Sequence, residues 1–191
     1  MRVCMVGSHG VGKSTLLAIL KEKYPHYDIQ LESLTRKTIN DPTKLNFTTP
    51  EESEKLLAEA YMQYFITNKD KDFISARGMI DVLAYSMYLA KKNGNIGEKV
   101  MLGIQEKIEK LKEMKLFDLV LYIPIEFDLP EVEKGAKFRE GQEDKQYRED
   151  IDGIIKFLLC GYNIPYVKIS GSKDERINKI VELLEKGKAN G

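Results

Sequence analysis

The sequence has no tryptophan and only two cysteines and two histidines in 191 residues. Cys4 and Cys160 both lie in apolar stretches, so we expect small core residues rather than a disulfide framework or a metal site. His9 and His26 are too few and too far apart to bind a metal ion. These shortages argue against a fold held by cross-links, and a chain of this length can bury a core without them.

The chain also has no excess of charge and no long apolar run. Lys and Arg number 30 and so do Asp and Glu, which gives no reason to expect indiscriminate binding to duplex nucleic acid, although a local basic patch remains open. No apolar run reaches membrane-spanning length, and the N-terminus leads into a predicted strand instead of a signal peptide. We therefore expect one domain over residues 1–191, in the cytoplasm and without membrane association.

What the sequence does contain is a glycine-rich turn between an apolar run, Arg2 to Val6, and a helical pattern that begins at Ser14. The turn has the Gly-x4-Gly-Lys-Ser spacing of a Walker A motif, or P-loop. Its backbone N–H groups are expected to surround a phosphate chain at the positive end of the helix dipole. Lys13 is expected to contact the β- and γ-phosphates, and the Ser14 hydroxyl to bind Mg²⁺. The predicted nucleotide-binding residues of this segment are Ser8, His9, Gly10, Val11, Gly12, Lys13, Ser14 and Thr15.

Strand and helix patterns alternate after this turn. Further strands are predicted at about 29–31, 72–75, 117–123 and 166–169, and helices at about 50–68, 81–91, 97–114, 147–160 and 173–186. Alternating elements imply right-handed βαβ units, and an apolar strand such as 117–123 suits a parallel sheet covered on both faces. The predicted fold is α/β, a doubly wound five-stranded parallel sheet in the three-layer sandwich of P-loop NTPases.

Two other classes of P-loop protein lack their signals here. GTPases recognise guanine with an Asn-Lys-x-Asp motif that follows a strand. In the segment Asn68 to Lys71 the Asp stands one position too early, and the segment precedes a strand. Large motor ATPases need an apolar strand that ends in acids, whereas the run Leu119 to Ile123 ends in proline. Phosphoryl transfer remains, and it needs cations that hold donor and acceptor in line and neutralise charge.

Three arginines are candidates for those cations. Arg77 follows the third predicted strand, while Arg139 and Arg148 belong to a charged, glycine-containing segment around residues 130–150. We expect this segment to act as a lid that excludes water, with Arg139 and Arg148 stabilising the transferring group. The alternative for any single residue is a solvated loop with surface ion pairs.

With these residues in view, the chain resembles the small P-loop kinases of the nucleoside and nucleotide group. It looks most like the ATPase/kinase family that includes ribosylnicotinamide kinase domains and bacteriophage deoxynucleotide kinases. The marks of the resemblance run through almost the whole chain: the P-loop with His9, the stretch Glu32 to Arg36, Ser75-Ala76-Arg77 with Asp81 to Tyr85, the lid-like Gly135 to Arg139, and Ser170-Gly171 followed by Arg176. The resemblance implies a nucleotide-kinase-like fold and a backbone contact from Ser170 and Gly171 to adenine.

The sequence departs from the family pattern at one position. The pattern has Asp-Arg at the end of the third strand, and this chain has Ala76-Arg77. In such kinases the Asp acts as general base or organises Mg²⁺, and the Arg grips the acceptor. Three explanations are open: an engineered substitution, a naturally impaired enzyme, or transfer of the role to Asp81 or Glu32. We favour the first.

The remaining acceptor-site candidates lie near the second and third strands. Glu32 and Arg36 offer a carboxylate for a sugar or base and a guanidinium for a phosphate, or they form an ion pair with each other. Tyr64 offers a stacking wall, although its helical spacing also suits the core. Asp81 either caps a helix or takes part in catalysis, and Tyr85 on the same helix is counted among the acceptor contacts.

These features together predict an ATP- and Mg²⁺-dependent kinase of a nucleoside or a nucleoside monophosphate, with a deoxynucleoside monophosphate as the first choice of acceptor. One alternative is a kinase of a hydroxymethylated base within DNA. Another is a nucleotide-dependent switch that hydrolyses ATP without a small-molecule acceptor. The sequence leaves open the acceptor base, the choice of ribose or deoxyribose, and the oligomeric state, with a homodimer as one option.

Overall fold

The computed structural model describes residues 1–29, 50–93, 97–128 and 145–189. The strands are β1 (Arg2–Val6), β2 (Asp28–Ile29), β3 (Phe73–Ser75), β4 (Leu119–Tyr122) and β5 (Val167–Lys168). The helices are α1 (Lys13–Lys23), α3 (Pro50–Thr67), α4 (Met79–Asn93), α5 (Glu98–Glu113), α6 (Lys145–Gly161) and α7 (Lys173–Ala189). Every predicted strand and helix is therefore present, with ends that shift by a few residues.

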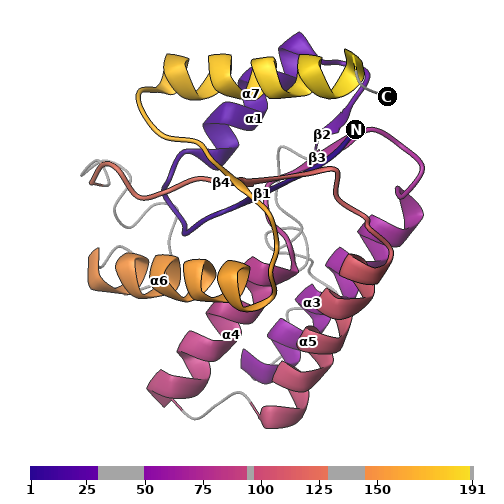
Figure 1. The fold of residues 1–191 in the computed structure, drawn as a ribbon. Helices are drawn as coiled ribbons and strands as arrows, with labels where there is room; N and C mark the ends of the chain where they lie inside the picture. Colours follow the sequence, from indigo (N-terminus) through magenta and orange to yellow (C-terminus); the bar gives the residue numbers. More distant parts are fainter. Residues whose placement is uncertain (30–49, 94–96, 129–144, 190–191) are drawn as a thin grey trace, which may run out of the picture.

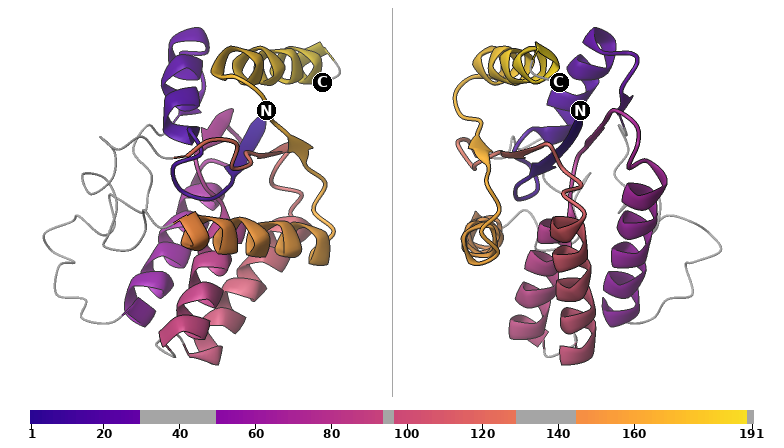
Figure 2. Two further views of the ribbon diagram at one scale, coloured as in Figure 1. Left: turned by 90° about the vertical axis from the view of Figure 1, so that its left-hand side faces the viewer. Right: turned by 45° about the vertical axis from the view of Figure 1, so that its right-hand side comes forward.

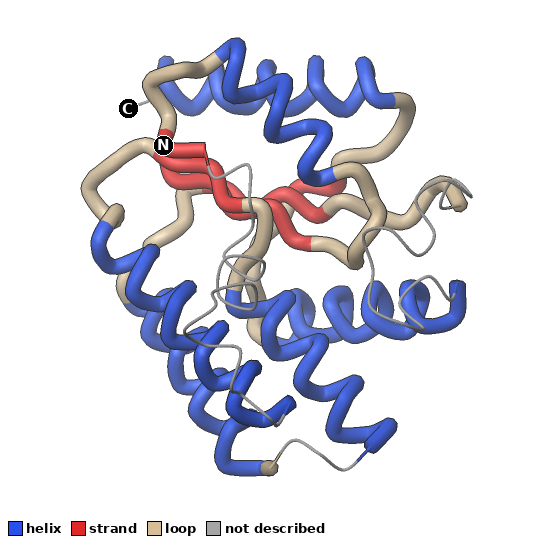
Figure 3. Tube along the Cα trace, turned by 180° about the vertical axis from the view of Figure 1, so that it is seen from behind, coloured by secondary structure: helices blue, strands red, loops and turns tan. Residues whose placement is uncertain are grey.

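The strands form one sheet in the order β2-β3-β1-β4-β5, and every neighbouring pair is parallel. Helices α1 and α7 lie on one face of the sheet, and α3, α4, α5 and α6 lie on the other (Figure 1). The turned views keep the same two helical layers (Figure 2), and from behind the strands lie between them (Figure 3). The predicted doubly wound parallel sheet and three-layer sandwich are confirmed.

The central strand explains why the N-terminal run is almost entirely apolar. Val3 and Met5 pack into the core beneath α1 and α7, whereas Cys4 and Val6 pack into the core beneath the other helices. Successive side chains of a strand point to opposite faces, so a strand covered on both faces needs apolar residues at every position.

The prediction for the cysteines holds for one of them. Cys4 is buried as expected, but Cys160 is exposed, so its placement in the core was wrong. Helix α6 buries a stripe that includes Ile151, Ile155 and Leu158. Cys160 is not part of this buried stripe, because it lies two residues beyond Leu158 and therefore on the opposite side of the helix.

Some sequence predictions fall outside the described residues. The second predicted strand is seen only at Asp28 and Ile29, and the lid-like segment is seen only where α6 begins at Lys145. Among the described residues, no helix is long and apolar enough to cross a membrane.

Candidate functional site: a P-loop with two flanking clusters

The P-loop follows β1 at the carboxyl edge of the sheet, which is where open α/β sheets bind ligands. Two of its glycines are required by the backbone. A Cβ atom on Gly7 would collide with the carbonyl oxygen of Ile123, which follows β4. Gly12 has φ +90 immediately before α1, a conformation that side chains other than glycine rarely adopt. The loop can thus lie against β4 and still enter the helix.

Lys13 is buried inside this loop. Its Nζ donates to the carbonyl oxygens of Gly7 at 2.5 Å and Ser8 at 2.7 Å. Burial, with the nearby positive charge of Arg77, lowers the pKa of Lys13 to about 7. The buried hydroxyl of Ser8 has no hydrogen-bond partner among the described residues. The loop therefore holds a desolvated amine ready for an anion, as the motif predicts.

The first turn of α1 presents Ser14 and Thr15, and both side chains are exposed. Mg²⁺ takes six oxygen ligands in near-octahedral geometry and usually binds one or two protein groups together with phosphates and water. The accessible Ser14 hydroxyl fits that requirement. No group of three His, Cys, Asp or Glu side chains in the described parts of the chain is placed to hold a metal by itself.

Asp81 joins the start of the P-loop to the start of α4. Its Oδ1 accepts the N–H of Gly7 at 3.1 Å, and its Oδ2 accepts the N–H of Gly78 at 2.9 Å. Gly78 precedes α4 and Asp81 is its third residue, so the carboxylate caps the helix from within. Burial raises the pKa of Asp81, against the opposing effect of Lys13 and Arg77. The helix-cap prediction matches this geometry.

A polar and aromatic cluster lies beside the loop on the β3–α4 side. The backbone N–H of His9 donates to the Tyr85 hydroxyl at 3.1 Å, and the same hydroxyl lies 2.9 Å from His9 Nδ1. Because the hydroxyl oxygen accepts the backbone N–H, its hydrogen is available to Nδ1, which leaves the proton of a neutral His9 on Nε2. Tyr147 packs on His9 at 5.3 Å, and Arg77 Cζ lies 4.9 Å from the centre of the Tyr85 ring. Arg77 and Tyr85 are thus brought together at the P-loop.

Position 76 directly follows β3 and precedes Arg77. Ala76 is buried with Ile74 in the core beneath α1 and α7, on the face of the sheet that carries the P-loop helix. The hydroxyl of the preceding residue, Ser75, donates to the Arg77 carbonyl at 2.5 Å. A carboxylate at position 76 would therefore face the layer that contains Ser14.

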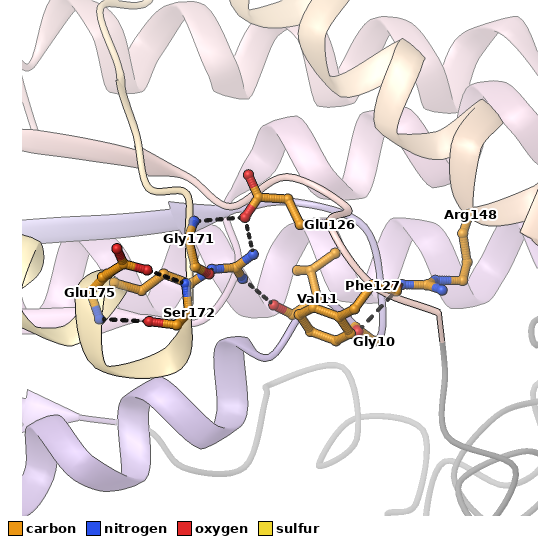
Figure 4. A network of polar contacts seen from close by, with 9 residues as sticks. Gly10, Val11, Glu126, Phe127, Arg148, Gly171, Ser172 and Glu175 are labelled. Atoms are coloured by element: carbon orange, nitrogen blue, oxygen red, sulfur yellow. Dashed lines mark hydrogen bonds and ion pairs between the residues drawn. The ribbon is translucent and has the colours of Figure 1, made fainter.

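The opposite side of the loop is organised by Arg176, of which only 3% is exposed. Its Nε donates to the Gly171 carbonyl at 2.8 Å, and its two terminal nitrogens donate to the Val11 carbonyl at 3.0 Å and to Glu126 Oε2 at 2.7 Å. Gly171 N–H donates to the same Glu126 oxygen at 2.8 Å (Figure 4). The Gly171 amide predicted to contact adenine is thus bonded within the protein, and Ser170 beside it is exposed.

Arg148 donates hydrogen bonds to backbone carbonyls of the P-loop. Its Nε donates to the His9 carbonyl at 3.4 Å, and one terminal nitrogen donates to the carbonyls of Gly10 at 3.4 Å and Phe127 at 3.3 Å (Figure 4). All these partners are neutral, and burial lowers the pKa of this guanidinium. Arg148 therefore lies at the loop without a carboxylate partner in these hydrogen bonds, and its stabilisation of the transferring group stays a prediction.

The other predicted residues are not part of this arrangement. Glu32, Arg36 and Arg139 lie outside the described residues. Tyr64 donates to Asp28 Oδ2 at 3.1 Å and packs on Phe73, at the starts of β2 and β3. The P-loop follows the opposite ends of the strands, so Tyr64 has the core role and we leave it out of the site.

Sequence reasoning missed Glu126 and Phe127 and gave Arg176 no role. Glu126 and Phe127 follow β4 at the same edge as the P-loop, and this position beyond a predicted strand was the signal that could have found them. Tyr147, which packs on His9, falls at a helical spacing that suits any core residue and carries no such signal.

The sheet order, the glycine loop and its buried lysine define a P-loop phosphate-binding protein. Residues 2–176 match the AAA domain family, and the chain belongs to that family. No curated protein sequence matches the chain.

Solved structures give the same picture of the fold. A deoxyadenosine kinase from M. mycoides, determined with dCMP and dCDP, aligns with a TM-score of 0.70 and 16% identity over 97% of this chain and 100% of its own. A thymidylate kinase from Candida albicans aligns at 0.62 with 19% identity over 98% and 92%. A NadR protein in complex with NAD and AMP-PNP aligns at 0.65 with 14% identity over 97% of this chain and 48% of its own. The fold of small P-loop nucleoside and nucleotide kinases is thereby shown.

Proposed function

We propose that the protein is a kinase that transfers the γ-phosphoryl group of ATP to a nucleoside or a deoxynucleoside monophosphate. The observation that carries this proposal is the position of Arg77, which lies against Tyr85 while Tyr85 contacts the P-loop through His9. A fixed cation beside the phosphate cradle suits an acceptor that carries a phosphate or sugar hydroxyls. The names of the similar structures, deoxyadenosine kinase and thymidylate kinase, support the same class of acceptor.

Each residue then has a defined task. Lys13 leaves the loop carbonyls and contacts the β- and γ-phosphates, while the loop amides surround them. Ser14 would hold Mg²⁺, which supplies charge neutralisation between the phosphates when it is bound. Arg77 orients the acceptor, and Arg148, with Arg139 of the predicted lid, neutralises charge on the transferring group. Catalysis of this kind depends on positioning and electrostatics rather than on covalent chemistry by the protein.

Acceptor-dependent ATP consumption tests the proposal. ADP formation is measured with Mg²⁺ and ATP alone, and then with each nucleoside, each ribo- and deoxynucleoside monophosphate, and DNA that contains a hydroxymethylated base. We expect ADP formation to rise with a deoxynucleoside monophosphate. A rise only with the modified DNA supports the DNA-base kinase, and a rate that no acceptor changes supports the nucleotide-dependent switch; either result contradicts the proposal.

A further inference from the structure

The P-loop divides the carboxyl edge of the sheet into two halves. Strand β1 lies between β3 on one side and β4 and β5 on the other. The β3 half carries Arg77 and Tyr85, which we assign to the acceptor. In-line transfer places the donor and the acceptor on opposite sides of the moving phosphoryl group. The β4–β5 half is therefore where the nucleoside part of the donor has to lie.

An aromatic side chain is held in that half. Phe127 is 45% exposed, yet its position is fixed from several directions. Its carbonyl accepts from Arg148 at 3.3 Å, and Arg176 Cζ lies 5.5 Å from the centre of its ring. A Cβ atom on Gly12 would lie 3.7 Å from its Cζ, so the ring reaches the residue that precedes α1. The ring lies on one buried arginine, and a second buried arginine binds the backbone of the same residue, so this exposed ring is pre-organised for a flat ligand.

Three backbone groups of the neighbouring loop are already bonded within the protein. Gly171 N–H donates to Glu126, and the Gly171 carbonyl accepts from Arg176. Ser172 N–H donates to Glu175 Oε2 at 2.8 Å. A base that lies here therefore finds these backbone groups engaged, while the ring of Phe127 remains open to it.

We propose that Phe127 is the stacking platform for the base of the nucleoside triphosphate donor, and that this half of the site discriminates only weakly among bases. Every base has a π-face, so recognition by stacking tolerates different bases, whereas recognition of the base edge requires free donors and acceptors at fixed places. The assignment of the base to the donor rests on the proposed function.

Binding measurements without an acceptor test this role directly. Calorimetry gives the Kd of ATP, GTP and inorganic tripolyphosphate for the wild-type protein and for Phe127→Leu, which keeps an apolar side chain but removes the ring. Phe157→Leu, the same substitution at an exposed ring on α6, is the matched control. We expect the wild-type Kd values of ATP and GTP to agree within about tenfold. Phe127→Leu should raise both by roughly 5- to 50-fold, given the usual strength of stacking on a base.

Tripolyphosphate separates stacking from support of the P-loop. Its Kd should not change in Phe127→Leu, and Phe127→Trp should restore the affinity for both nucleotides. Equal weakening of tripolyphosphate and nucleotides would overturn the platform, and so would unchanged nucleotide binding in Phe127→Leu. A preference of 100-fold or more for ATP over GTP would overturn weak discrimination. Because no acceptor is present, failure of phosphoryl transfer leaves these results intact and counts only against the proposed function.

Discussion

The two halves of the site are built in different ways. On the β3–α4 side, the side chains of Asp81, His9 and Tyr85 are buried and bond to the P-loop or to one another, with Arg77 against them. On the β4–β5 side, Arg176 bonds to carbonyl groups and one carboxylate, and an exposed ring covers it. The first arrangement places charge at fixed points and suits selective binding of an acceptor. The second supports the loop and offers a flat apolar surface, which suits a donor that is recognised mainly by its phosphates.

The largest effect should come from restoring the missing carboxylate on the β3 side. We expect Ala76→Asp to raise acceptor-dependent ADP formation by roughly 10²- to 10⁴-fold, the usual contribution of a general base. The measurement is kcat at saturating ATP and acceptor, with thermal unfolding to show that the fold is kept.

Ala76→Asn is the control for Ala76→Asp, because it has nearly the same shape but cannot accept a proton at neutral pH. A gain with Asp and none with Asn supports a missing base. If turnover with Asp equals that of the wild type, the role lies elsewhere, and Glu32 or Asp81 becomes the residue to substitute.

A smaller effect should come from a substitution that weakens binding of the acceptor more than binding of the donor. Replacing Arg77 by Gln removes a charge-assisted contact worth about 1.5–3 kcal/mol, so the KM of the acceptor should rise roughly 10- to 150-fold. The Kd of ATP should change much less, because Arg77 lies on the acceptor side and acts on the donor only through its effect on the pKa of Lys13. Lys92→Gln, at the exposed end of the same helix, is the matched control. Equal losses for ATP and acceptor in Arg77→Gln would show that the two halves do not act separately.

The smallest effect is the uptake of a proton by Lys13, which lies in the P-loop between the two halves, when ATP binds. The Lys13 pKa of about 7 should rise when phosphates arrive, so ATP binding should take up a proton above pH 7. The affinity for ATP should then fall by up to about tenfold per pH unit above 7. Calorimetry in buffers of different ionisation enthalpy measures the uptake.

A matched pair of variants assigns that proton. Lys13→Arg should bind without proton uptake, because Arg stays charged, and Lys21→Met on the exposed side of α1 should behave as wild type. Since the folded pKa is lower than the 10.5 of the unfolded chain, the unfolded state binds more protons between pH 7 and 10.5. The unfolding free energy should therefore rise with pH in that window, and less so in Lys13→Arg. Wild-type binding without uptake would contradict a desolvated lysine.

The fold was predictable because its signals are local. An apolar run, a glycine-lysine-serine turn and an amphipathic helix follow each other within the first 23 residues, and the same alternation of strand and helix repeats along the chain. Lys13 and Arg77 could also be named in advance, since the first belongs to a motif and the second follows a strand at the ligand-binding edge.

The polar clusters were not predictable in the same way, because their partners come from distant parts of the chain. Arg176 meets the Val11 carbonyl across 165 positions, and nothing in the sequence near either residue marks that contact. Tyr64 shows the converse problem: an aromatic residue at helical spacing can face a pocket or the core, and only its contact with Asp28 decides the matter. Cys160 illustrates how a two-residue step around a helix reverses burial.

The fate of the γ-phosphoryl group itself distinguishes transfer to an acceptor from hydrolysis at the P-loop. ATP labelled with ¹⁸O in its γ-phosphate is incubated with the wild-type protein or Ala76→Asp and with a deoxynucleoside monophosphate, and the products are separated by mass spectrometry. We predict that the label appears in the deoxynucleoside diphosphate. Label found only in inorganic phosphate, with the acceptor unchanged in both proteins, would show that the P-loop serves hydrolysis and that the protein is not a kinase of this acceptor.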